Sequence, residues 1–114
     1  MRKALIVGID HYENVSPLFG CVNDAYSIKS VLERNSDGTI NFSSKLEVAT
    51  NSSSAISRKE LKELTKELFN DDSDVAIFYF SGHGYVEKTG GYLITSECSD
   101  GDDGFPLTEL LQIA

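Results

Sequence analysis

The chain has 114 residues, 40% of them hydrophobic and 25% charged, an ordinary composition for one globular domain. Its formal net charge of −8 argues against nucleic acid as a partner, because an anionic surface repels a phosphate backbone. No stretch of eighteen apolar residues occurs, and the apolar run after Arg2 and Lys3 is too short for a signal peptide. We therefore expect a cytoplasmic protein that neither binds nucleic acid nor spans a membrane.

Short apolar runs alternate with helical patterns along the chain. Residues 3–9 and 74–80 are continuous runs rich in β-branched and aromatic residues, typical of central strands covered on both faces. Residues 45–50 predict a weaker strand between them. Apolar residues recur at helical spacing in 22–34 and in 58–69, which predicts two helices.

The second half of the chain adds a cap, a hairpin and a last helix. Ser57 and Glu60 stand at the spacing of a capping box before the second helix. Residues 86–95 predict a β-hairpin, residues 99–104 form an acidic, glycine-containing loop, and a final helix begins near Leu107.

This order of elements predicts an α/β fold with a mostly parallel sheet and helices on both faces. In such sheets the chemistry lies beyond the carboxyl ends of the strands. Here Asp10 and His11 follow the first strand, and residues 81–84 follow the third. The last helix reaches Ala114 without a glycine cap or a basic last turn. We therefore expect a portion of a larger domain, with a sheet that is incomplete at its C-terminus.

The most informative motif is Ser81-Gly82-His83-Gly84. An imidazole at a strand end can accept and return a proton near neutral pH, and flanking glycines let a substrate approach the backbone. The amide of Gly84 can donate to a developing oxyanion. The alternative is a histidine that only bonds to backbone in a tight turn.

A second group of residues opens the first helix, in the segment Gly20-Cys21-Val22-Asn23-Asp24-Ala25. Asn23 and Asp24 are expected to cap backbone amides there and to favour the helix dipole. This capping role is the alternative to a functional role for Asp24. Cys21 taken alone is typical of a small buried residue.

Together these motifs resemble the caspase-like cysteine peptidases (clan CD, peptidase family C14), especially metacaspases and their bacterial relatives. The matching segments are residues 3–9, 18–25, 79–84 and 91–94, in the order that the family has them. The resemblance implies a caspase-like three-layer α/β/α sandwich, with residues 1–114 forming the N-terminal portion of the peptidase domain.

The resemblance also implies a Cys–His dyad, in which His83 activates a cysteine thiolate and protonates the leaving amine. The Gly84 amide would supply half of the oxyanion hole. In this family the cysteine ends the next strand, in an Asp-x-Cys sequence about 50 residues after the histidine in caspases. Only 31 residues follow His83. We therefore expect the nucleophile-bearing strand to be missing and the isolated chain to be inactive.

Two cysteines are present, and neither is favoured as the nucleophile. Cys98 follows the hairpin strand rather than the next central strand, and Cys21 begins a helix that the family uses for substrate recognition. The two cysteines form no Cys-x-x-Cys pair, and they do not stand at zinc-ligand spacing from the histidines. We expect neither a disulfide scaffold nor a structural metal site.

Substrate preference follows from the same comparison. Caspases hold a P1 aspartate with an arginine two residues before the glycine of this segment, where this chain has Leu18. Metacaspases use an acidic pocket for P1 arginine or lysine, and Asp24 stands at the matching position. The resemblance therefore implies a protein or peptide substrate cleaved after Arg or Lys, with Asp24 in substrate binding.

The acidic loop near the C-terminus suggests a possible calcium site. Asp100, Asp102 and Asp103 could suit a cation that prefers oxygen ligands, but they do not match the EF-hand spacing. Calcium-dependent metacaspases carry an acidic cluster soon after the histidine, whereas residues 85–91 contain Glu87 as their only acid. A solvated acidic loop is the favoured interpretation, and we expect no cofactor.

Other function classes remain open. The same fold can serve as a non-catalytic interaction or regulatory module, as in pseudo-enzymes. A nucleotide-binding domain is disfavoured, because the first strand leads into Gly8-Ile9-Asp10 rather than a glycine-rich phosphate loop, and no Walker lysine occurs. An incomplete sheet exposes a strand edge. We therefore expect a second chain or a downstream segment to complete it.

Overall fold

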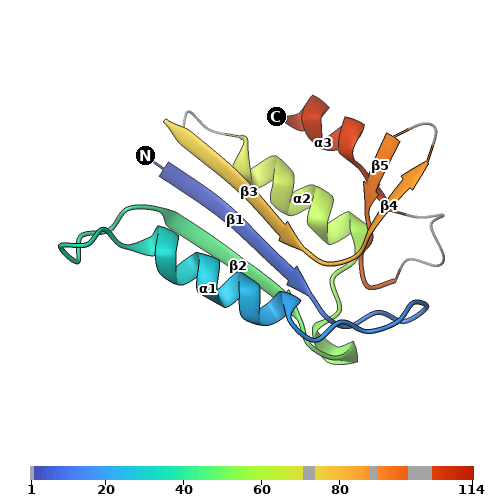
Figure 1. The fold of residues 1–114 in the computed structure, drawn as a ribbon. Helices are drawn as coiled ribbons and strands as arrows, with labels where there is room; N and C mark the ends of the chain where they lie inside the picture. Colours follow the sequence, from blue (N-terminus) through green and yellow to red (C-terminus); the bar gives the residue numbers. More distant parts are fainter. Residues whose placement is uncertain (1, 71–73, 88–89, 98–103) are drawn as a thin grey trace.

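A three-stranded parallel sheet with the order β2-β1-β3 forms the centre of the molecule (Figure 1). The computed structural model describes residues 2–70, 74–87, 90–97 and 104–114. The strands are β1 (Arg2–Ile9), β2 (Ser43–Ala49) and β3 (Val75–Ser81). β1 lies between the other two strands, and its residues 4–9 are all buried. This burial is what an apolar run covered on both faces of a sheet predicts.

Helices cover both faces of this sheet (Figure 1). Helix α1 (Cys21–Glu33) packs on one face, and α2 (Arg58–Leu68) packs on the other with α3 (Leu107–Ile113) beside it. Successive side chains of β1 point to opposite faces. Ala4 and Ile6 accordingly share a core cluster with Ala25 of α1, whereas Leu5 and Val7 share one with Leu61 of α2. The predicted three-layer α/β/α arrangement is confirmed.

A small antiparallel sheet follows β3, with the order β4-β5-β6. Its strands are β4 (Gly84–Glu87), β5 (Gly90–Leu93) and β6 (Phe105–Pro106). The hairpin of β4 and β5 confirms the predicted one, but it begins at Gly84, immediately after His83. Phe105 in β6 is fully buried and belongs to the same core cluster as Leu61.

Side-chain caps determine where two of the helices begin. The Ser57 hydroxyl accepts the amide of Glu60 at 3.1 Å, so the predicted cap begins α2. The connection before it contains a short 3₁₀ helix, η1 (Ser52–Ser54). The side chain of Asn51 caps this turn by accepting the amide of Ser53. A polar cluster of this kind favours a capped turn as much as an open loop.

The outer edge of β3 faces away from β1. In the described parts of the chain, β1 is the only strand that pairs with β3. Val75, at its start, is 41% exposed, and the other residues of β3 are only partly buried. β3 is therefore less covered than β1, although its sequence is equally apolar.

Several residues singled out in the sequence lie outside the described ranges: Cys98, Asp100, Asp102 and Asp103. Among the helices that the structure describes, none combines the length and apolar character needed to cross a membrane.

Candidate active site

The segments that follow the three parallel strands meet at the carboxyl edge of the sheet (Figure 1). The β1–α1 loop (residues 10–20) is joined to β2, because the amides of Asp10 and His11 both donate to the carbonyl of Ala49, at 2.9 and 3.1 Å. The same loop is joined to the segment after β5, where the Glu13 amide donates to the Ser96 carbonyl at 2.9 Å. These bonds hold the loop beside the end of β3.

His83 lies against this loop. Its Nε2 is 2.8 Å from the carbonyl oxygen of Ser16. A carbonyl can only accept a hydrogen bond, so Nε2 carries the proton in this pair, and Nδ1 holds the lone pair of the neutral ring. The imidazole thus bonds to backbone, but to a segment 67 residues away rather than within its own turn. The geometry leaves Nδ1 to take up a proton.

The backbone of His83 is also held from two sides. Its amide donates to the hydroxyl of Tyr12 at 2.8 Å, and its carbonyl accepts the amide of Ile94 at 3.0 Å. The rings of Tyr12 and His83 meet edge to face, with centroids 4.7 Å apart and an interplanar angle of 64°. Tyr12 is buried. It was not identified from the sequence.

Gly82 is a glycine for a steric reason. A Cβ at this position would lie 2.6 Å from the Tyr12 hydroxyl oxygen and 3.0 Å from Cζ of Phe80. Any side chain here would displace the tyrosine or the phenylalanine ring. The first glycine of the Gly-His-Gly motif therefore makes room for Tyr12.

The amide of Gly84 is directed away from the hairpin. Gly84 pairs with Leu93, and the neighbouring Ile94 amide donates to the His83 carbonyl. In an antiparallel ladder this makes Gly84 and Leu93 a non-hydrogen-bonded pair, so the Gly84 N–H points outward from β5. The Gly84 N–H is therefore not used in the ladder between β4 and β5.

The start of α1 is capped by a residue outside the helix. The Asp10 carboxylate accepts the amides of Cys21 at 2.9 Å and Val22 at 3.4 Å. The expected capping by Asn23 and Asp24 is wrong, because the helix begins at Cys21 and Gly20 occupies the N-cap position without a side-chain bond. Both side chains are exposed on the first turn. Asp24 therefore lies near the sheet edge with its carboxylate open to solvent.

Cys21 lies where a strand and a helix approach closely. A Cβ on Gly8 would come within 2.6 Å of the Cys21 carbonyl, so Gly8 lets α1 pack directly on β1. Cys21 is half-buried and forms no disulfide in the described part of the chain. Among the described residues, no hydrogen bond joins it to His83, so the structure does not pair this thiol with the imidazole.

The second histidine of the chain and the potential metal ligands that the structure describes give no further site. The Nε2 atom of His11 is buried and lacks a hydrogen-bond partner in the described part of the chain. Within the same ranges, no group of three or more His, Cys, Asp or Glu side chains is placed to hold a metal ion.

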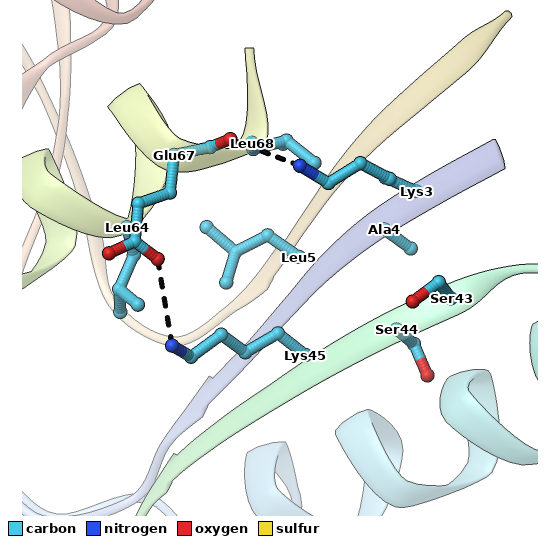
Figure 2. Close-up of a pocket in the computed structure, with 9 residues that line it drawn as sticks. All are labelled: Lys3, Ala4, Leu5, Ser43, Ser44, Lys45, Leu64, Glu67 and Leu68. Carbon is cyan, nitrogen blue, oxygen red and sulfur yellow. Dashed lines mark hydrogen bonds and ion pairs between the residues drawn. The ribbon is translucent and has the colours of Figure 1, made fainter. Parts of the chain in front are cut away.

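A small pocket lies at the opposite edge of the sheet. It has a volume of about 120 Å³ and lies between α2 and the beginnings of β1 and β2 (Figure 2). Lys3 donates to the Glu67 carbonyl at 3.2 Å, and the Lys45 ammonium lies 3.6 Å from the Glu67 carboxylate. Both cations therefore have an internal partner, and the pocket contains none of the residues of the His83 site.

The chain is thus a parallel α/β/α sandwich with a glycine-flanked histidine at its carboxyl edge, the arrangement expected of the caspase-like class of proteins. Residues 1–113 match the model of the caspase domain, and the chain belongs to this family, peptidase family C14. The predicted resemblance is confirmed.

Metacaspases are among the relatives of the chain. It is 32% identical over 92 residues to metacaspase-1 of Meyerozyma guilliermondii, and 29% identical over 90 residues to metacaspase-1 of Schizosaccharomyces pombe. It is 30% identical over 92 residues to metacaspase-1 of Plasmodium falciparum. Each match covers 76% of this chain but only 15–22% of the relative. All three relatives are eukaryotic.

Proposed function

We propose that this chain is the histidine-bearing portion of a cysteine endopeptidase that cleaves after Arg or Lys. Membership of the caspase-domain family supports the peptidase class. The observation that carries the proposal is the contact between His83 Nε2 and the Ser16 carbonyl, which leaves Nδ1 as the basic nitrogen of the neutral ring.

The proposed reaction uses His83 twice. Nδ1 takes the proton of a cysteine thiol, and the thiolate attacks the carbonyl carbon of the scissile peptide bond. The resulting oxyanion accepts the Gly84 N–H, while the Ser16 carbonyl stabilises the imidazolium through its Nε2–H. Nδ1 then returns the proton to the leaving amine, and water hydrolyses the thioester.

The nucleophilic cysteine is proposed to come from a segment that completes the sheet beside β3. The outer edge of β3 supports this placement, because that strand ends two residues before His83 and pairs only with β1 in the described residues. A downstream segment of the same protein or a second chain would add the missing strand. Residues 1–114 alone are then expected to be inactive.

Specificity for basic residues is proposed to come from Asp24. Its side chain is exposed in the first turn of α1 and makes no capping bond, so the carboxylate is free to meet a cationic side chain. The proposed reaction needs no metal or organic cofactor.

The test is peptide hydrolysis by the protein expressed from its full reading frame. Arg-, Lys- and Asp-terminated fluorogenic peptides are assayed with the parent protein, with His83→Ala and with His11→Gln. We expect turnover of the Arg and Lys peptides that falls about 10²–10⁴-fold in His83→Ala, the usual contribution of a general base. His11→Gln is the control, because it removes the other imidazole of the chain.

A protein that cleaves none of these peptides would contradict the proposal and favour a non-catalytic interaction module. Cleavage after Asp alone would contradict the assignment of a basic P1 residue.

A further inference from the structure

The β1–α1 loop makes three contacts with His83, and two of them come from Tyr12. We infer that Tyr12 is a positioning residue, which fixes His83 through its hydroxyl and its ring; its catalytic consequence rests on the proposed peptidase function. Both contacts of Tyr12 described above are with His83, and it is through His83 that Tyr12 is proposed to act.

The position of Tyr12 is itself well determined. Its side chain is only 6% exposed, and its neighbours in the chain are held by backbone bonds on both sides, from Asp10 to Ala49 and from Glu13 to Ser96. A residue held in this way restricts the movement of the residue that it contacts. The loop therefore gives His83 a rigid support that does not depend on the substrate.

The contact is directional. The Tyr12 hydroxyl oxygen receives the amide of His83, which fixes the backbone, and the edge-to-face ring contact restricts rotation of the imidazole. Because Gly84 follows directly, a shift of the His83 backbone also turns the Gly84 amide. One tyrosine thus sets both the base and the proposed oxyanion donor.

Gly82 provides independent support for this arrangement. The position next to His83 has no space for a Cβ because the Tyr12 hydroxyl occupies it, at 2.6 Å. The absence of a side chain at Gly82 therefore leaves the space that the Tyr12 hydroxyl occupies.

The test compares Tyr12→Phe with Tyr26→Phe in the protein from its full reading frame. Tyr26 is 53% exposed on α1, so its variant removes a hydroxyl without touching His83. In Tyr12→Phe we expect a displaced NMR resonance for the His83 amide and hydrogen exchange at that amide at least about fivefold faster. Tyr26→Phe should change neither.

The catalytic arm uses the same variants. Tyr12→Phe should lower kcat about tenfold with little change in KM, because the base is misplaced while the substrate contacts remain. Tyr12→Leu also removes the ring and should lower kcat further. An unchanged His83 resonance and exchange rate in Tyr12→Phe would overturn the inference. A parent protein inert toward every peptide would contradict only the proposed function, and the NMR result would still decide the role of Tyr12.

Discussion

Asp24 is exposed in the first turn of α1. Its proposed contact with a basic substrate side chain can be tested by removing its charge. We expect Asp24→Asn in the full-length protein to reduce kcat/KM for Arg peptides about 10–100-fold, the value of a lost charge-assisted hydrogen bond. The adjacent variant Asn23→Ala is the control, since that side chain is also exposed on the first turn of α1. Steady-state kinetics measure the change. Equal activity of Asp24→Asn and the parent would remove Asp24 from the substrate site.

Individual site residues differ in how far the sequence could reveal them. His83 and Gly84 stand in a local motif, and a glycine-flanked histidine after an apolar strand already predicts a functional loop. Tyr12 and Ser16 could not be found in this way, because their contacts with His83 span 71 and 67 residues. No local pattern reports such contacts, which depend on the two strand ends meeting at one sheet edge.

Helix α1 depends on a cap supplied by another element. Asp10 follows β1 and bonds the first amides of the helix, where its negative charge also meets the positive end of the helix dipole. We expect Asp10→Ala to lower the free energy of unfolding by about 0.5–2 kcal/mol, the usual cost of losing a cap.

Asp10→Asn is the matched variant, because its amide oxygen can still accept from Cys21. It should retain most of the stability that Asp10→Ala loses. Urea unfolding of the protein measures both changes. If the two variants lost equal stability, or if neither lost any, the cap would not be holding α1.

Among the elements, the continuous apolar runs of seven residues were predictable from the sequence, and the two-residue strand β6 was not. β1 and β3 appear within one or two residues of the expected ranges, because continuous β-branched and aromatic runs are typical of strands. β6 has two residues, too few to show any periodicity, and its position follows from pairing with β5. The cap of α1 was wrongly expected from Asn23 and Asp24, because the helix begins two residues before Asn23.

At the scale of the whole molecule, the proposed completion of the sheet beside β3 can be tested by amide exchange. If a further strand pairs with its outer edge in the full-length protein, the β3 amides that face away from β1 will be protected there. In residues 1–114 alone, we expect alternate β3 amides to exchange rapidly, while those bonded to β1 stay protected. Hydrogen–deuterium exchange on both proteins measures this difference. Identical protection of β3 in the two would contradict a completed sheet.

The measurement that tests the central claim most directly is covalent labelling of the nucleophile. The full-length protein is treated with an Arg-terminated peptide carrying a thiol-reactive acyloxymethyl ketone, and peptide mass spectrometry locates the label. The account predicts one labelled cysteine outside residues 1–114, with labelling strongly reduced in His83→Ala. Labelling of Cys21 or Cys98, or equal labelling with and without His83, would contradict it.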